Sequence, residues 1–467
     1  MRQTEQAIQR IQALIGERVS TAETVRAQHG RDEFWHHAAL PDAVAYAHST
    51  EEVVEIVKIC ADTRTPIIAF GAGTSVEGHV QAVHGGITID LSEMNQVLEV
   101  NPEDFDCTVQ AGVRRKQLNN YIRDTGLWFP VDPGADATIG GMAATRASGT
   151  NAVRYGTMKD NVLSVKAVLA NGEVIKTSQR VKKTAAGLDL TRLFVGSEGI
   201  LGIMTEITVR LHGIPEFIAS AVVSFPTIKA AVDCTVETIQ AGVPIARVEL
   251  LDEVQLKAVN DYSGFDYPVL PTLFMEFNGS PKGVEEQIEI VKAIVKDNDG
   301  GEFRWETVQE KRDALWQARH DAAYAVKALR KGAELWGTDC CVPLSKLTEC
   351  ILDTKRDLET CSFPAPMLGH VGDGNYHLIY VIDPNSEAEI KEAEELNERM
   401  IRRALAAGGT CTGEHGIGLG KKHFLVEELG GAVDVMWQIK RSMDPMNIMN
   451  PGKMLQEPGQ TASILTG

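Results

Sequence analysis

The segment Pro66-Ile-Ile-Ala-Phe-Gly-Ala-Gly-Thr-Ser75 determines how the rest of this chain is interpreted. Its apolar half predicts a short buried strand, and its second half predicts a glycine turn followed by small hydroxyl residues. Glycine leaves the backbone bare, so N–H groups can converge on phosphate oxygens. The segment is neither a Gly-x-Gly-x-x-Gly helix start nor a P-loop, because no Gly-Lys-Ser/Thr follows. Alone it is a weak signal, since tight turns are commoner than phosphate loops.

Two more glycine-rich segments follow. In Pro130–Asn151 almost every side chain is small, with Ile139, Met142 and Arg146 as the main interruptions. A flexible linker is the plain alternative, but no Ser/Gly repeat is present. The third segment is Leu193–Ile203, which contains Gly-Ser-Glu-Gly-Ile-Leu-Gly. We interpret the long segment as the wall of a site where a bulky ligand lies against bare backbone.

Two histidines flank a turn in Gly369-His-Val-Gly-Asp-Gly-Asn-Tyr-His-Leu378. Asp-Gly in a short loop is a strong hairpin signal. With Asp373-Gly374 as the loop, His370 is expected to face His377 across the hairpin. Opposed residues on one face have Cβ atoms about 4.5–5.5 Å apart, close enough for two imidazoles to share a divalent cation. The alternative is that both histidines are ordinary strand residues.

A third ligand would complete such a site, and Glu414 within Gly413-Glu-His-Gly416 is the candidate. A mixture of imidazole and carboxylate ligands favours zinc or manganese over magnesium or calcium. The sequence therefore predicts a metal site made of His370, His377 and Glu414.

Composition restricts the class of protein. A chain of 467 residues with 43% hydrophobic and 24% charged residues is expected to fold into two or three domains. The net charge of −18 argues against a nucleic-acid partner. We expect no membrane span, no signal peptide and no transit peptide. Eight cysteines without a Cys-x-x-Cys pair indicate reduced thiols. These features predict a cytoplasmic protein, or one peripheral to the inner membrane.

The periodicity along the chain predicts an α+β protein with a separate module that begins near residue 216. Helices are expected over residues 3–15, 50–60, 115–124, 227–240, 283–297, 306–330, 344–358 and 386–407, with a capping threonine at Thr50. Strands are expected over residues 66–70, 86–91, 108–113, 162–169, 174–177, 205–211, 219–225, 246–251, 272–278 and 337–342.

Together these segments resemble the FAD-linked oxidoreductases of the vanillyl-alcohol oxidase type, over roughly residues 35–455. The resemblance implies a PCMH-type FAD-binding domain of two α+β subdomains, a cap domain with an antiparallel sheet, and a C-terminal tail that returns to the flavin. The corresponding division is 1–35 (helical segment), 36–215 (FAD-binding domain), 216–420 (substrate- and metal-binding cap) and 421–467 (C-terminal segment). Asn450-Pro-Gly-Lys453 matches the tail.

The resemblance also implies which residues bind FAD. The expected cofactor-binding residues are Phe70, Gly71, Ala72, Gly73, Thr74, Ser75, Pro133, Gly134, Thr138, Gly140, Gly141, Ala147, Ser148, Gly149, Glu198, Gly199, Ile203 and Asn450. Some family members attach FAD covalently through a histidine, and Thr74 stands at that place here. The FAD is therefore expected to be non-covalent.

Within the family, the histidines and Glu414 resemble the D-2-hydroxy-acid dehydrogenase branch. The resemblance makes His370, His377 and Glu414 metal ligands, His415 the catalytic base, and Arg319 the partner of the substrate carboxylate. The metal would steady the alkoxide while FAD accepts the hydride.

The segment Leu315–Tyr324, together with Thr338–Pro343, looks most like the cytochrome-type D-lactate dehydrogenases. Ala323 and Ile379 stand where D-2-hydroxyglutarate enzymes carry polar residues, and a second buried carboxylate without partners would be costly. A monocarboxylate such as D-lactate is therefore expected, with D-2-hydroxyglutarate or glycolate as alternatives. Two other functions stay open at this point: the FAD subunit of a glycolate oxidase within a larger complex, and a flavin-free metallohydrolase. The expected electron acceptor is cytochrome c, a quinone or an electron-transfer flavoprotein. The protein is expected to be a homodimer.

Overall fold

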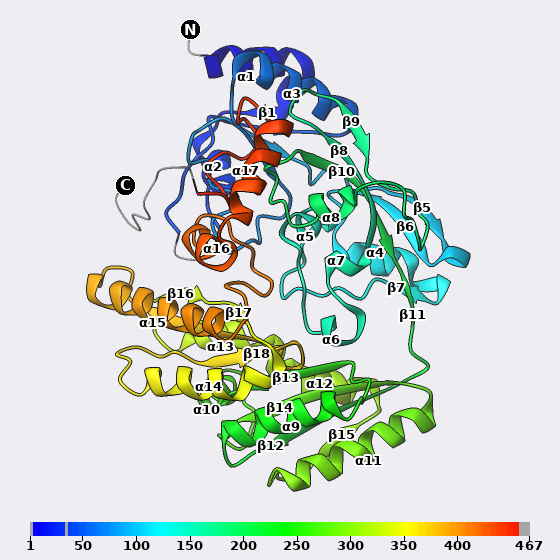
Figure 1. Cartoon of the computed structure of the whole chain (residues 1–467), viewed down its shortest axis with the longest axis vertical. Coiled ribbons are helices and arrows are strands. Elements are labelled where there is room, and N and C mark those ends of the chain that lie inside the picture. Colours follow the sequence, from blue (N-terminus) through cyan, green and yellow to red (C-terminus); the bar gives the residue numbers. More distant parts are fainter. Residues whose placement is uncertain (1–2, 33–35, 457–467) are drawn as a thin grey trace. The chain divides into compact units, whose positions relative to one another are not determined.

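The computed structural model describes residues 3–32 and 36–456 (Figure 1). The chain forms two compact units. The first unit comprises Met1–Ser148, Thr157–Gly213 and Glu414–Gly467, and the second comprises Gly149–Gly156 and Ile214–Gly413. The predicted division, with boundaries after residues 35, 215 and 420, stays a prediction.

A small sheet in the first unit carries the first glycine segment. Its strand order is β1 (Val19–Ser20), β2 (Ala43–Tyr46), β4 (Ile87–Asp90), β3 (Ile67–Phe70), and β2, β4 and β3 run parallel. Helix α3 (Thr50–Thr63) connects β2 to β3, which lie on either side of β4, and is the crossover that parallel strands of one sheet require. Its N-cap is Ser49, whose hydroxyl accepts a hydrogen bond from the Glu52 N–H, so the predicted cap at Thr50 was wrong by one residue. Helices α1 (Gln3–Ile15) and α2 (Glu23–His29) precede this sheet.

A second, antiparallel sheet of the first unit holds the other two glycine segments. Its order is β5 (Val97–Asn101), β6 (Asp106–Gln110), β10 (Ile203–Arg210), β8 (Val162–Val168), β9 (Val174–Lys176). Around it lie α4 (Arg115–Ile122), α5 (Ile139–Thr145), α7 (Met158–Asn161), α8 (Leu190–Phe194) and the pair β7 (Leu127–Trp128) and β11 (His212–Gly213). Helices α16 (Lys422–Leu429) and α17 (Ala432–Met443) follow near the C-terminus, and Met449 then forms a parallel bridge to Ile67 of β3.

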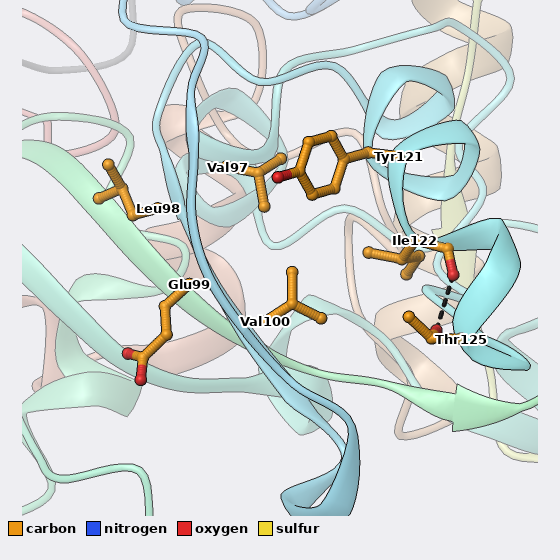
Figure 2. A pocket seen from close by; sticks show the side chains of 7 residues that line it. All are labelled: Val97, Leu98, Glu99, Val100, Tyr121, Ile122 and Thr125. Carbon is orange, nitrogen blue, oxygen red and sulfur yellow. Dashed lines mark hydrogen bonds between the residues drawn. The ribbon is translucent and has the colours of Figure 1, made fainter.

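Edge strand β5 borders a shallow pocket of about 200 Å³ (Figure 2). A bulge between Val97 and Glu99 breaks the alternation of side chains along the strand. Figure 2 shows Val97 and Val100 directed toward α4, where Tyr121 lies. None of the site residues predicted from the sequence lines this pocket.

The second unit is built on one antiparallel sheet. Its order is β15 (Arg304–Glu306), β12 (Phe217–Ser224), β14 (Thr272–Gly279), β13 (Arg247–Leu251), β18 (Met367–Gly369), β19 (Asn375–Ile382), β16 (Glu334–Gly337), and β17 (Cys340–Cys341) also pairs with β19. Its helices are α6 (Ala152–Tyr155), α9 (Ile228–Gln240), α10 (Glu253–Ser263), α11 (Pro281–Asp297), α12 (Gln309–His320), α13 (Ala322–Ala328), α14 (Leu344–Leu358) and α15 (Glu387–Ala406).

One face of this sheet packs on α10, α12 and α13. The core there includes Leu251 of β13, Trp316 of α12 and Val381 of β19. The single helix expected over residues 306–330 is wrong: Glu306 ends a strand, and Asp321 separates α12 from α13. The α+β architecture expected from the sequence is confirmed.

Candidate functional site

The first two glycine segments lie against each other within the first unit. A Cβ atom on Gly71 would be 2.3 Å from Thr138 Oγ1, so only glycine fits there without a shift. The same hydroxyl accepts a hydrogen bond from the Gly141 N–H at 3.2 Å and caps α5. Gly73 has a φ of +70°, which glycine adopts without strain. Bare backbone therefore lines the turn after β3.

The third glycine segment is fastened to the second and to the C-terminal tail. The Gly196 and Glu198 N–H groups donate hydrogen bonds to the carbonyls of Ala143 and Ala144, each at 2.9 Å. Asn450 Nδ2 donates to the Glu198 carbonyl at 2.7 Å. The first and third segments, the second segment as far as Ser148, and the tail thus converge in one unit.

The predicted cofactor residues occupy the following places. The end of β3 and the loop after it contain Phe70, Gly71, Ala72, Gly73, Thr74 and Ser75. Around α5, Pro133 and Gly134 precede the helix, Thr138, Gly140 and Gly141 lie at its start, and Ala147 and Ser148 follow it. The segment before β10 contains Glu198 and Gly199, β10 begins with Ile203, and the tail contains Asn450. Gly149 instead falls in the second unit. Their contacts with FAD stay predictions.

Glu198 has a further role that sequence reasoning missed. Its buried carboxylate accepts hydrogen bonds from the Ile417 and Gly418 N–H groups at 2.7 and 2.9 Å and lies 3.4 Å from His79 Nε2. Burial alone raises the pKa of Glu198, but His79 and the two N–H groups outweigh it and lower that pKa.

The two histidines meet, although not by the predicted pairing. His377 in β19 lies opposite Leu368, and His370 lies outside β18 as the N-cap of the 3-10 turn η4 (Val371–Asp373). The predicted register was therefore wrong by two residues, because the loop is longer than Asp373-Gly374. A shift by an even number keeps side chains on the same face of a sheet. The imidazole centroids are 5.5 Å apart with an interplanar angle of 81°.

Both imidazoles are buried and oriented through Nδ1. His377 Nδ1 lies 2.9 Å from the Thr338 carbonyl oxygen, and His370 Nδ1 lies 2.6 Å from Glu249 Oε1. A carbonyl oxygen only accepts, so His377 carries its proton on Nδ1. In the neutral ring this leaves the lone pair on Nε2, which is the usual arrangement of a metal-ligating histidine.

Glu414 directly follows Gly413, the last residue of the second unit. A Cβ on Gly413 would lie 2.3 Å from Asn375 Nδ2, so this end of the loop is packed tightly beside the hairpin. One ligand atom from each of His370, His377 and Glu414 can be chosen so that all lie within 4.8 Å of one another. The three residues predicted as ligands therefore form a group that could hold a metal ion.

Arg319 lies on α12, and its Nε donates to Glu249 Oε2 at 2.8 Å. Glu249 is fully buried in β13. Burial alone raises the pKa of Glu249, but the charges and hydrogen bonds of His370 and Arg319 outweigh it and hold the pKa below its ordinary value. One carboxylate therefore joins the predicted substrate-binding arginine to a predicted metal ligand.

His415 belongs to the first unit. Its Nδ1 lies 3.9 Å from Glu77 Oε1, too far for a hydrogen bond. Lys421 Nζ lies 3.1 Å from the same oxygen. Burial raises the pKa of Glu77, and the Lys421 ammonium only partly offsets this effect.

Sequence reasoning missed the buried carboxylates Glu77 and Glu249. Glu249 had a signal, since it interrupts the apolar strand Ala246-Arg-Val-Glu-Leu-Leu251, where an unpaired charge would be costly. Glu77 had none, because its neighbours Val76 and Gly78 do not distinguish a buried position from an exposed one.

Comparison with known proteins places this geometry in a family. Residues 41–178 match the FAD binding domain, and residues 214–454 match the C-terminal domain of FAD linked oxidases. The chain belongs to the FAD-linked oxidases. p-Cresol methylhydroxylase with substrate bound shares the fold, with a TM-score of 0.81 over 98% of each chain at 18% identity.

Several relatives of this FAD-linked oxidase are named as D-lactate dehydrogenases. A probable mitochondrial D-lactate dehydrogenase of Danio rerio is 54% identical, covering 94% of this chain and 89% of the relative. The mitochondrial cytochrome-type enzymes of Arabidopsis thaliana and Saccharomyces cerevisiae are 45% and 43% identical, covering 96% and 91% of this chain and 80% and 74% of theirs. The family expected from the glycine segments is confirmed.

The predicted location of this FAD-linked oxidase was wrong. The sequence suggested a cytoplasmic protein or one peripheral to the inner membrane, whereas these relatives are named mitochondrial. Charge and cysteine content do not distinguish the two compartments, since both hold folded acidic proteins with reduced thiols. No helix in residues 3–32 and 36–456 is both long and apolar enough to cross a bilayer.

The residues of the first unit fit FAD. Ser75 Oγ and Ser197 Oγ are buried and have no hydrogen-bond partner among the described residues, although buried hydroxyls are normally paired. Both belong to the glycine segments, where a cofactor with many polar oxygens would supply the missing partners. FAD, as the family match implies, is the cofactor that this cradle accommodates.

Proposed function

We propose that this chain is an FAD-dependent D-lactate dehydrogenase that oxidises D-lactate to pyruvate. The reaction removes the proton of the hydroxyl group and a hydride from the carbon that bears this hydroxyl. FAD supplies the hydride acceptor when it is bound. The single observation that carries the proposal lies in the second unit. There the buried carboxylate of Glu249 binds both His370 and Arg319, and the His370 ring lies 5.5 Å from the ring of His377.

Arg319 is the residue proposed to bind the lactate carboxylate. Its Nε is engaged by Glu249, so its terminal N–H groups are oriented by a fixed partner. Two parallel N–H bonds to a carboxylate are strong and set the orientation of the ligand.

His370, His377 and Glu414 are proposed to hold zinc or manganese. Such a cation supplies Lewis acidity toward the substrate hydroxyl. Chelation tests this part: EDTA is expected to abolish turnover, and zinc or manganese to restore it. Turnover by protein shown by elemental analysis to lack both metals would remove the cation from the mechanism.

His415 is proposed to take the hydroxyl proton. Imidazole titrates near neutral pH and commonly serves as a general base. The Ile417 and Gly418 N–H groups that bind Glu198 hold the loop just after it.

Ala323 on α13 and Ile379 on β19 support a monocarboxylate substrate. Neither side chain can donate a hydrogen bond to a second carboxylate, and the Ile379 side chain is buried. Glycolate is the second candidate, because a glycolate oxidase subunit of Bacillus subtilis is 35% identical over 89% of both chains. The flavin-free metallohydrolase is disfavoured, since residues 41–178 match an FAD binding domain.

The proposed electron acceptor is cytochrome c, because three relatives carry cytochrome in their names. A quinone and an electron-transfer flavoprotein are the alternatives to assay beside it. The protein is proposed to be a homodimer, which sedimentation would test.

A substrate screen tests the whole proposal. Purified flavoprotein is mixed anaerobically with D-lactate, L-lactate, glycolate or D-2-hydroxyglutarate, and bleaching of the flavin band is followed. D-lactate is expected to bleach it fastest and L-lactate not at all. Faster bleaching by glycolate or D-2-hydroxyglutarate would replace lactate as the substrate, and no bleaching by any of them would overturn the proposal.

A further inference from the structure

Glu249 occupies a position where a carboxylate is costly. Side chains alternate along a strand, so Glu249 shares its face of β13 with Leu251, a member of the core against α10, α12 and α13. The Glu249 side chain has no exposed surface. A buried charge at such a place is tolerated only when it is paired and hydrogen-bonded.

The two partners of Glu249 come from separate elements. Oε1 lies 2.6 Å from His370 Nδ1, in the loop after β18, and Oε2 lies 2.8 Å from Arg319 Nε, on α12. Each oxygen therefore holds one group. The strand that carries Glu249 is central in the sheet and pairs with β14 and β18, so the carboxylate projects from a rigid element.

We propose that Glu249 is a positioning residue that orients the metal ligand His370 and the substrate-binding Arg319 together. Binding Nδ1 of His370 directs its Nε2 as the coordinating atom, and binding Nε of Arg319 directs its terminal nitrogens toward the lactate carboxylate. The inference rests on the proposed function, because it assumes that His370 holds a cation and that Arg319 holds the substrate.

A structural ion pair is the competing explanation. Under it, loss of Glu249 lowers stability but alters neither cation affinity nor the KM for D-lactate in the protein that remains folded. Asp252 supplies a matched control for this explanation. It lies directly after β13, is equally buried, and pairs with Lys355 Nζ at 3.0 Å.

The test uses full-length protein containing FAD, with the cation removed by chelation. Zinc chloride or manganese chloride is titrated calorimetrically into wild type, Glu249→Gln, Glu249→Asp and Asp252→Asn. A glutamine side chain accepts through one oxygen only and presents an amide donor to the other partner. Glu249→Gln is expected to weaken cation binding about 10–100-fold, as for loss of a group that orients a ligand. KM for D-lactate is expected to rise as well, with FAD content unchanged.

Glu249→Asp keeps both acceptor oxygens on a shorter side chain, so its cation affinity and its KM for D-lactate are expected to lie between those of Glu249→Gln and wild type. This variant also keeps the test possible if Glu249→Gln does not fold. Asp252→Asn is expected to lose stability but to keep both constants within about twofold. If Glu249→Gln and Glu249→Asp bind the cation and D-lactate like wild type, the inference fails and the proposed function stands. If wild type binds neither zinc nor manganese, the proposed metal site fails and the inference with it.

Discussion

The two units build their candidate sites from different parts of the chain. In the first unit, backbone lines the site, because glycines at three segments remove side chains and fasten to one another through N–H and carbonyl groups. In the second unit, side chains form the site, and each depends on another side chain or carbonyl for its orientation. Substitutions should therefore fail differently in the two units: by steric exclusion in the first and by loss of orientation in the second.

His415 provides the strongest test, since it is a reactive side chain in the unit built from backbone. His415→Ala is expected to lose about 10²–10⁴ in turnover, because proton transfer loses its base. FAD content and cation content should stay at the wild-type values, measured by absorbance and elemental analysis. His423→Ala, in the same unit and without a proposed role, is the control. Full turnover in His415→Ala would remove His415 from the mechanism.

Gly71 tests steric exclusion directly. The Cβ of Gly71→Ala would meet Thr138 Oγ1 at 2.3 Å and push this hydroxyl from its capping position on α5. Overpacking of this kind costs about 1–3 kcal/mol, which is about 5–150-fold in FAD affinity if the cost falls on the bound state. Flavin content after dialysis measures the loss, and cation affinity should not change.

A second substitution sharpens that test. Thr138→Ala removes the atom that would clash, so the Gly71→Ala/Thr138→Ala variant should lose less flavin than the sum of the single losses predicts. Additive losses would show that Gly71 is needed for backbone conformation and not for space.

Sequence reasoning worked where the requirement was for a residue type at fixed spacing. The three glycine segments and the Asn450 tail could be recognised because bare backbone leaves a trace in composition. The histidine pair could be recognised because Asp373-Gly374 signals a turn, and an even shift in register left both imidazoles on one face.

Sequence reasoning failed where the requirement was for a partner distant along the chain. Glu249 pairs with His370 and Arg319 at separations of 121 and 70 residues, and no local pattern encodes such contacts. The break between α12 and α13 was not predicted for a related reason. The position of Asp321 depends on tertiary contacts, such as the hydrogen bond that it accepts from Ser263 Oγ at 2.6 Å. The cellular compartment could not be predicted in this way, because it does not depend on how the chain packs.

Asp339 tests how far orientation in the second unit depends on carboxylates. It accepts hydrogen bonds from Asn375 Nδ2 at 2.7 Å and Thr412 Oγ1 at 2.6 Å, and lies 3.6 Å from His377 Nδ1. Since the Thr338 carbonyl also holds His377, Asp339→Asn is expected to weaken zinc binding about tenfold, the lower end for such groups. A loss as large as that of Glu249→Gln would mean that the carboxylate, and not the carbonyl, sets the ring.

His29 is the exception in the unit built from backbone, and we expect its effect to be the smallest. Its Nδ1 lies 2.8 Å from the Val25 carbonyl and its Nε2 lies 2.9 Å from Asp90 Oδ2. Both partners accept hydrogen bonds, so the site favours the protonated ring, which carries an N–H at both nitrogens. The ring packs on Phe70, 4.3 Å between centroids, directly before the glycine turn. Burial lowers the pKa of His29, but the bonds to Asp90 and Val25 outweigh it and raise the pKa above 6.5.

The raised pKa of His29 in the folded state determines the direction in which stability changes with pH. The stabilisation is complete below the unfolded pKa of 6.5 and is lost as pH rises through the folded value. The temperature of flavin release should therefore fall by about 2–4 °C for each 1 kcal/mol lost across that range. His29→Gln should flatten this dependence, whereas His48→Gln should keep it, because solvent screens the exposed pair of His48 with Glu93. A wild-type profile without this fall would mean that the His29–Asp90 pair contributes no pH-dependent stability to the first unit.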